Sequence, residues 1–271
     1  MQANFRGRLR GYLSTLRAGA SLLHPHLVRL ALGAPREQLR AYADAAFKLY
    51  MESQCTGLEF LELGEAVGRL GLDPTVVQAT LVDVGGYRGR SDWERLFLAL
   101  AVRSQDAAPC FEIGTAAGNT TVQLASNTGQ VVYTLDLADA ADAQPTLTRL
   151  GSDDVVRASR VRAEFIRRNP RTNIVEMTGD SAAFDFTPFL GRIGLFFVDG
   201  AHSLEYVRHD SANAARCCRD DGLIVWDDFT TTREVTQFVM DLRRSGAEVF
   251  GLRGTRLAFS RDIGRLRGIL A

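Results

Sequence analysis

Lysine is nearly missing from this sequence of 271 residues, since Lys48 is the only one and the other 31 basic side chains are arginines. The basic residues are balanced by 32 acidic ones, so the formal net charge is zero. A generic nucleic-acid-binding surface needs a clear excess of positive charge. The balance therefore argues against nucleic acid as a partner, and we attribute the preference for arginine to genome composition.

Cysteine is scarce too, and its spacing excludes the usual cysteine sites. The four cysteines are Cys55, Cys110, Cys217 and Cys218. None of them forms a CxxC pair, and two adjacent cysteines cannot easily bind one metal ion. We therefore expect small, buried, apolar side chains in a reducing compartment rather than a zinc site or a disulfide framework.

Long apolar runs are absent as well. No segment approaches the about 20 apolar residues needed to cross a bilayer, and arginines interrupt the N-terminus where a signal peptide has its apolar core. We therefore expect a cytoplasmic protein without a transmembrane segment. Residues 1–36 hold six arginines and no acidic residue, which could serve an anionic partner or a membrane surface. Alternatively, these arginines pair with acidic residues of the same protein or of a second subunit.

The chain divides into two parts with different patterns. Residues 1–85 show helical periodicity, with apolar faces over Arg36–Met51, Leu58–Leu70 and Pro74–Val84. A pair of glycines then ends that pattern, and residues 86–271 follow. We expect the first part to be a small N-terminal helical domain, either a lid or the contact surface of a homo-oligomer.

The second part alternates short apolar runs with amphipathic helices, which is the pattern of a parallel sheet covered on both faces. A capping box at Ser91 and Glu94 begins an expected helix over Asp92–Arg103, and a later helix covers Arg160–Arg168. This pattern predicts an α/β fold whose last two strands form an antiparallel hairpin. The seven expected strands are Cys110–Ile113, Val131–Leu135, Asn173–Met177, Leu195–Val198, Leu223–Trp226, Glu248–Leu252 and Arg256–Ser260.

A strand followed by a glycine turn and a helix is the first candidate binding motif. Gly114 and Gly118 lie four positions apart after the strand, where the lack of a side chain lets the backbone approach a ligand. Asp136 ends the next strand, about 20 positions after the turn, where a carboxylate can accept hydrogen bonds from both hydroxyls of a ribose. Taken singly, the glycines could be a structural turn and Asp136 could cap a helix. Together they indicate a nucleotide-like cofactor.

The glycine turn lacks the GxGxxG spacing that binds a pyrophosphate at a helix N-terminus. A sulfonium cofactor has no phosphate, and its positive charge suits a turn that carries the carboxylate of Glu112. On these residues the sequence resembles the class I S-adenosylmethionine-dependent methyltransferases, whose fold is a seven-stranded Rossmann-like sheet with a terminal hairpin. A third match is Thr178–Ser181, which the resemblance places against the adenine ring. The resemblance thus implies S-adenosyl-L-methionine as the cofactor, held by Glu112, Gly114, Thr115, Gly118, Asp136, Asp180 and Ser181.

Acidic side chains mark the carboxyl ends of the next two strands. Asp199 follows one strand, with His202 three residues later, and Asp227 and Asp228 follow the other. Ligands bind at this edge of an open α/β sheet, and three carboxylates that converge there repel one another unless a cation is present. Oxygen ligands favour Mg²⁺, Mn²⁺ or Ca²⁺, and such an ion lowers the pKa of a bound hydroxyl. We expect the three aspartates to bind a divalent cation, with Mg²⁺ the first candidate, and His202 to be the catalytic base.

One branch of the family resembles the sequence more closely. Three stretches carry this resemblance: VDGAHSLEYVRHD, GLIVWDDF and LRGTRLAFSR. The branch includes metal-dependent O-methyltransferases of macrolide and aminocoumarin deoxysugars, which implies a sugar or natural-product hydroxyl as the acceptor. Catechol-type relatives often have lysine in place of His202 and asparagine in place of Asp228. In the alternative interpretation, Asp227 and Asp228 cap a helix, and His202 positions the substrate or caps its loop.

The sequence therefore predicts metal-assisted methyl transfer from S-adenosylmethionine to a hydroxyl of a small molecule. One rival is a metal-independent methyltransferase that acts on nitrogen or on a carboxylate. The other is a non-catalytic cofactor-binding scaffold. The segment Ala138–Ser159 is expected to be a long connection that covers the cofactor or the substrate, because loops of this length are usually functional.

Overall fold

The computed structural model describes residues 50–83, 90–138, 145–158 and 161–271. Two compact units divide the chain, residues 1–56 and residues 57–271. Of the first unit only residues 50–56 are described, and residues 50–54 are helical. Most of the predicted helix Arg36–Met51 and the arginines of residues 1–36 lie outside the described residues.

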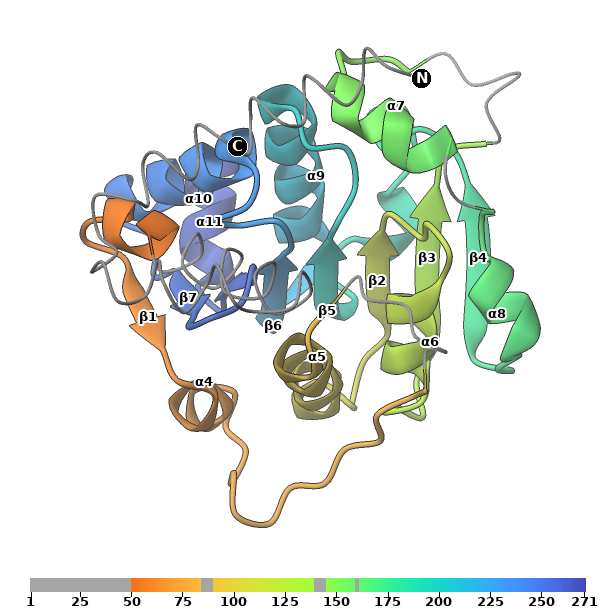
Figure 1. Cartoon of the computed structure of the whole chain (residues 1–271), viewed down its shortest axis with the longest axis horizontal. Coiled ribbons are helices and arrows are strands. Elements are labelled where there is room, and N and C mark those ends of the chain that lie inside the picture. Colours follow the sequence, from red (N-terminus) through yellow and green to blue (C-terminus); the bar gives the residue numbers. More distant parts are fainter. Residues whose placement is uncertain (1–49, 84–89, 139–144, 159–160) are drawn as a thin grey trace, which may run out of the picture. The chain divides into compact units, whose positions relative to one another are not determined.

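A single sheet of eight strands forms the larger unit, with the order β1-β7-β8-β6-β5-β2-β3-β4 (Figure 1). Strand β8 is antiparallel to both β6 and β7, and every other pair is parallel. The strand order reverses at β2, which lies between β3 and β5, so ligands are expected beside the carboxyl ends of these strands. The strands are β1 Glu59–Leu61, β2 Cys110–Ile113, β3 Val132–Asp136, β4 Ile174–Thr178, β5 Ile193–Val198, β6 Cys218–Trp226, β7 Phe250–Leu252 and β8 Ala258–Ser260.

Eight strands replace the seven predicted ones because the segment Leu58–Leu70 is not one helix. It begins as β1, which extends the sheet by pairing with β7. Helix α4, Leu63–Arg69, follows after a capping box formed by Glu62 and Glu65. A three-residue strand is too short for its side-chain alternation to be separated from helical periodicity.

The predicted helix Pro74–Val84 is wrong over its described part, since residues 74–83 contain turns and irregular backbone but no helix. Side-chain amides satisfy this backbone instead. The N–H of Thr80 donates to Asn127 Oδ1 at 2.8 Å, and the N–H of Val82 donates to Gln123 Oε1 at 2.9 Å. Long-range partners of this kind override local periodicity.

The helices fall into two packed groups. Helices α4, α5, α6 and α8 form one series of contacts, and α9, α10 and α11 form another. Helix α5 begins at the predicted capping box, with the Ser91 hydroxyl accepting from the Glu94 N–H. Helix α7 lies inside the segment predicted to be a connection, and α8 is shorter than predicted. The bounds are α5 Asp92–Ser104, α6 Asn119–Ala125, α7 Gly151–Ala158, α8 Glu164–Arg168, α9 Leu204–Cys217, α10 Arg233–Arg244 and α11 Ile263–Leu270.

The central strands are covered on both faces. All six residues of β5 are buried, as are the last five of β6, which is the pattern of a parallel strand between two layers of helices. The four cysteines are free and buried, as the sequence predicts. Among the residues the structure describes, no helix combines the length and the apolar character needed to span a bilayer.

Candidate active site

A cavity of about 390 Å³ opens at the carboxyl ends of the central strands. It joins the two groups of residues singled out in the sequence. The glycine turn, Asp136 and the Asp180 segment form one part of its wall, and the aspartates after β5 and β6 form another. The predicted residues that line it are Gly114, Thr115, Gly118, Asp136, Asp180, Ser181, Asp199, His202, Asp227 and Asp228.

The glycines of the turn are required by the protein's own packing. Gly114 has φ of 99°, and a Cβ there would lie 1.9 Å from the carbonyl oxygen of Asp199. Gly118 has φ of 89°, and its Cβ would lie 2.4 Å from the side chain of Ile166. Other residues rarely adopt this left-handed backbone. The sequence argument assigned the glycines to ligand approach, whereas the structure shows that they let the turn pack against the loop after β5 and against α8.

Glu112 lies beneath the turn and is not among the residues that line the cavity. Its carboxylate is fully buried and accepts hydrogen bonds from the hydroxyls of Thr121 at 2.5 Å and Thr134 at 2.7 Å. Burial raises the pKa of Glu112 to about 7 despite these two donors. The predicted contact between Glu112 and the cofactor is therefore replaced by a structural link between β2, β3 and α6.

Asp136 sits at the edge of the turn and organises its backbone. Its Oδ2 accepts the N–H of Ala116 and its Oδ1 accepts the N–H of Leu137, both at 2.8 Å. The hydroxyl of Thr115 lies 2.7 Å from that of Thr134. Each carboxylate oxygen has two lone pairs, so Asp136 keeps acceptor capacity toward the cavity.

Asp180 is held from two further segments. The Tyr206 hydroxyl, on α9, lies 3.0 Å from both of its carboxylate oxygens, and the N–H of Thr146 donates to Oδ2 at 2.6 Å. Burial alone would raise the pKa of Asp180, but the hydrogen bonds from Thr146, Ala182 and Tyr206 outweigh it and hold the pKa below its usual range. The carboxylate is therefore charged at neutral pH and faces the cavity beside Ser181.

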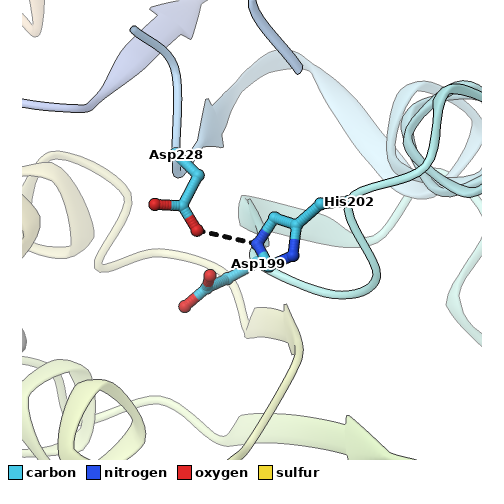
Figure 2. Close-up of side chains that lie close together, drawn as sticks. All are labelled: Asp199, His202 and Asp228. Atoms are coloured by element: carbon cyan, nitrogen blue, oxygen red, sulfur yellow. Dashed lines mark ion pairs between the residues drawn. The ribbon is translucent and has the colours of Figure 1, made fainter. Parts of the chain in front are cut away.

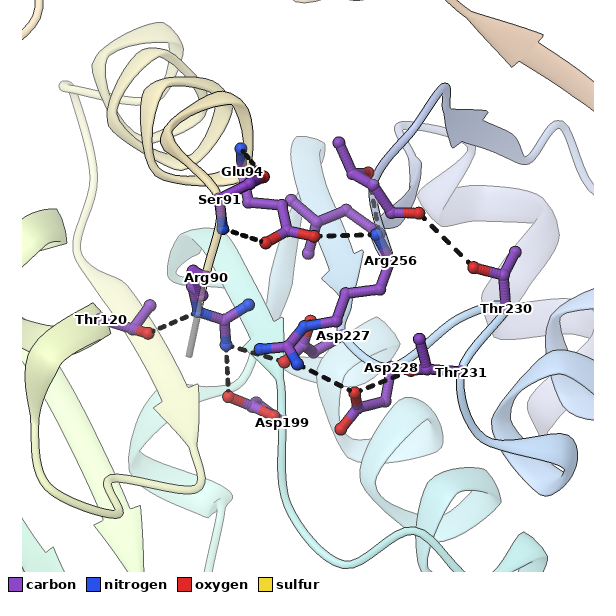
Figure 3. Close-up of polar contacts among 12 residues, drawn as sticks. Arg90, Ser91, Glu94, Thr120, Asp199, Asp227, Asp228, Thr230, Thr231 and Arg256 are labelled. Carbon is purple, nitrogen blue, oxygen red and sulfur yellow. Dashed lines mark hydrogen bonds and ion pairs between the residues drawn. The ribbon is translucent and has the colours of Figure 1, made fainter. Parts of the chain in front are cut away.

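Two arginines lie among the three aspartates, as Figure 3 shows. Arg90 Nη2 is 2.5 Å from Asp199 Oδ2 and 2.8 Å from Asp227 Oδ2. Arg256 Nε is 3.2 Å from Asp227 Oδ1, and its Nη1 is 3.6 Å from Asp228 Oδ1. The repulsion among these carboxylates, which led to the prediction of a cation, is therefore offset within the protein itself.

His202 is held between two carboxylates. Its Nδ1 lies 2.6 Å from Asp153 Oδ1, and its Nε2 lies 2.7 Å from Asp228 Oδ2, the ion pair drawn in Figure 2. Burial alone would lower the pKa of His202, but the bonds and charges of Asp153 and Asp228 outweigh it and raise the pKa to about 11. In this arrangement the ring is an imidazolium at neutral pH.

One atom each from Asp199, His202 and Asp228 lie within 4.8 Å of one another, a spacing that could admit a metal ion. Asp227, the remaining predicted ligand, instead faces Arg90 and Arg256. The structure thus brings all the predicted metal and base residues to one corner of the cavity.

Arg90, Arg256 and Asp153 are the residues of this corner that the sequence reasoning missed. Arg90 directly precedes the capping box of α5, and its partner Asp199 is 109 positions away. Asp153 lies on α7, in the segment predicted to be a connection. The position of Arg90 before a well-defined helix start was a usable signal, but no spacing pointed from any of the three to its partner.

Solved structures similar to this chain include three for which the printed descriptions name a methyltransferase or a bound cofactor. The O-methyltransferase from Bacillus cereus in complex with SAH is 18% identical, with 73% of this chain and 88% of that chain covered and a TM-score of 0.44. The O-methyltransferase NovP is 14% identical, with 62% and 78% covered and a TM-score of 0.47. Cofactor-bound Rv0187 from MTB is 19% identical, with 73% and 86% covered and a TM-score of 0.45. No curated protein matches the sequence.

A protein-family model described as a methyltransferase domain matches residues 111–229. The matched segment runs from β2 through the glycine turn and Asp136 to the residues that follow β6, so it contains both groups of residues that line the cavity. The strand order and the antiparallel β8 place these residues at the edge of the sheet where ligands bind. The chain is a class I S-adenosylmethionine-dependent methyltransferase.

Proposed function

We propose that the enzyme transfers the methyl group of S-adenosylmethionine to a hydroxyl oxygen of a small molecule, with a sugar or natural product as the substrate class. The observation that carries this proposal is the single cavity that joins the cofactor motifs to the Asp199, His202 and Asp228 corner. A cofactor bound along the turn has its reactive end beside a group of polar side chains that can bind a hydroxyl.

The proposed cofactor contacts follow from the geometry of the turn. Asp136 accepts the ribose hydroxyls with the acceptor capacity left after its two backbone bonds. Asp180 and Ser181 contact the adenine, and the backbone from Gly114 to Gly118 receives the amino-acid end of the cofactor. The cofactor supplies an activated methyl group, and these residues fix its orientation.

The reaction needs alignment and removal of one proton. The acceptor oxygen forms a bond to the methyl carbon while the bond from that carbon to sulfur breaks, and S-adenosylhomocysteine leaves. Positioning supplies much of the rate in such a displacement, because reactants held in line avoid the entropic cost of meeting. We propose that the hydroxyl proton passes to His202 Nε2, the ring nitrogen that faces Asp228. Only the neutral ring can accept it, so with a pKa of about 11 the activity should rise through the alkaline range.

The resemblance also implies a divalent cation held by Asp199, Asp227 and Asp228, with Mg²⁺ as the first candidate. These residues do not fit a bound dication while Arg90 and Arg256 keep their places, because guanidinium groups already pair with all three carboxylates. Metal dependence therefore stays a prediction from the sequence, and no step of the reaction proposed here passes through a metal.

A product-mass screen tests the proposed function. The purified protein is incubated with S-adenosylmethionine bearing a deuterated methyl group and with a panel of hydroxylated sugars and natural products. We expect one class of acceptor to gain the labelled methyl group as an ether, and S-adenosylhomocysteine to form in equal amount. Label found on nitrogen or on a carboxylate would support the first rival instead. Cofactor binding without turnover of any acceptor would support the scaffold.

A further inference from the structure

Arg90 is one of the most completely held charged side chains of the cavity wall. Its side chain is 9% exposed, and its guanidinium carbon lies 4.9 Å from the centre of the Phe197 ring. Nε donates to the Thr120 hydroxyl at 2.9 Å, and Nη2 pairs with Asp199 and Asp227 (Figure 3). Four different segments therefore fix the plane of this guanidinium.

One nitrogen of that guanidinium is left over. Nη1 of Arg90 is buried and has no hydrogen-bond partner among the residues that the structure describes. A buried N–H without an acceptor is unfavourable, and native proteins rarely leave one. Arg90 lines the cavity together with Asp199 and Asp228, so a ligand oxygen can reach this corner.

The charge of Arg90 is permanent. Its pKa lies above its usual value, because the charges of Asp227 and Asp199 outweigh the effect of burial. A divalent cation at the corner formed by Asp199, His202 and Asp228 shares Asp199 with this guanidinium. Two groups of positive charge that share one buried carboxylate repel each other strongly, because the interior screens them weakly.

We propose that the Arg90 guanidinium takes the place of a divalent cation in this enzyme, neutralising Asp199 and Asp227 and offering Nη1 to the acceptor oxygen. This inference rests on the proposed function, because it names the group that binds the acceptor hydroxyl. The acceptor oxygen lies at Nη1, where the hydrogen bond orients it and lowers the pKa of its hydroxyl. Arg256 completes the balance by pairing with Asp227 and Asp228.

Direct measurement of Mn²⁺ binding tests the proposal without relying on activity. Free Mn²⁺ is followed by electron paramagnetic resonance during titration of the metal-stripped wild-type protein and of Arg90→Met. We expect no stoichiometric binding to the wild type. Affinity should rise about 100-fold in Arg90→Met, since the substitution frees two carboxylates and removes a buried positive charge. The matched control is Arg149→Met, which removes a cavity-lining arginine whose partner is Asp154, at 2.6 Å, and should leave Mn²⁺ binding unchanged.

Stoichiometric binding of Mn²⁺ to the wild type, or an Arg90→Met protein that folds and gains no affinity, would overturn the proposal. If Arg90→Met does not fold, the wild-type titration decides alone. Turnover by the metal-stripped wild type supports the inference, and turnover only after metal is restored contradicts it. A protein that transfers no methyl group fails the proposed function, while its Mn²⁺ titration still decides the role of Arg90 in charge compensation.

Discussion

Asp136 combines two roles that are usually separated, since it both orders the glycine turn and faces the cofactor. Its two oxygens accept backbone N–H groups from the residues on either side of the turn and from the start of the next loop. A substitution there removes a ligand contact and loosens the backbone beside it. The effect on cofactor binding should therefore exceed that of one lost hydrogen bond.

Replacing Asp136 by alanine should weaken binding of S-adenosylhomocysteine by about 1.5–3 kcal/mol, because a charged acceptor for two hydroxyls is lost. Isothermal titration calorimetry measures the change. The control is Asp185→Ala, an exposed aspartate that also accepts a backbone N–H and does not line the cavity. An unchanged dissociation constant in folded Asp136→Ala would remove this residue from the cofactor site.

His202 should make the stability of the protein depend on pH. Asp153 on α7 and Asp228 after β6 face its ring and raise the pKa from 6.5 to about 11, and Arg256 is the cation nearest to that pair. A raised histidine pKa stabilises the fold fully below the unfolded value and loses the effect as pH rises through the folded value. The stability gap between wild type and His202→Gln, from urea unfolding, should therefore shrink between about pH 6 and about pH 10. A gap that is constant or grows over this range contradicts the ion pairs.

The turn between β2 and α6 is an element whose shape depends on two contacts of different hardness. Gly114 packs against backbone, and Gly118 packs against the side chain of Ile166. A side chain can move by a few tenths of an ångström at modest cost, whereas a carbonyl fixed at the end of β5 cannot. The two glycines should therefore tolerate substitution unequally.

Gly114→Ala should destabilise the fold by about 3 kcal/mol or more, and Gly118→Ala by about 1–2 kcal/mol. Urea unfolding of both variants checks the order. The double variant Gly118→Ala with Ile166→Ala should lose less stability than the sum of its two single changes, because the smaller side chain makes room. Equal losses for the two glycine variants would show that backbone strain, and not these contacts, decides.

How far the sequence predicts each element depends on where its hydrogen-bond partners lie. Strands β2 and β3 and helix α5 were predicted within a residue or two, because apolar runs and a capping box are local signals. Strand β1 was missed because it is an edge strand that exists through its pairing with β7, which is distant in the sequence. Residues 74–83 follow an irregular path because amides on and just after α6 bind their backbone, and no local pattern reveals that.

At the scale of the whole molecule, the site is an assembly of strand ends and loops that are distant in the sequence. The sequence predicted the aspartates and His202 because the carboxyl ends of parallel strands must meet at one edge. It missed Arg90, Arg256 and Asp153, because each reaches the site through a tertiary contact. These missed residues change the chemistry of the corner, since they supply the positive charge that the sequence argument assigned to a metal and a second carboxylate for the histidine.

The central claim is that the cavity holds S-adenosylmethionine with its methyl group facing the corner formed by Asp199, His202 and Asp228. A crystal structure with S-adenosylhomocysteine tests it most directly. We expect the ribose at Asp136, the adenine at Asp180, and the sulfur on the side of the cavity that faces His202 and Arg90. Cofactor bound outside this cavity, or bound in it with the sulfur turned away from that corner, would contradict the claim.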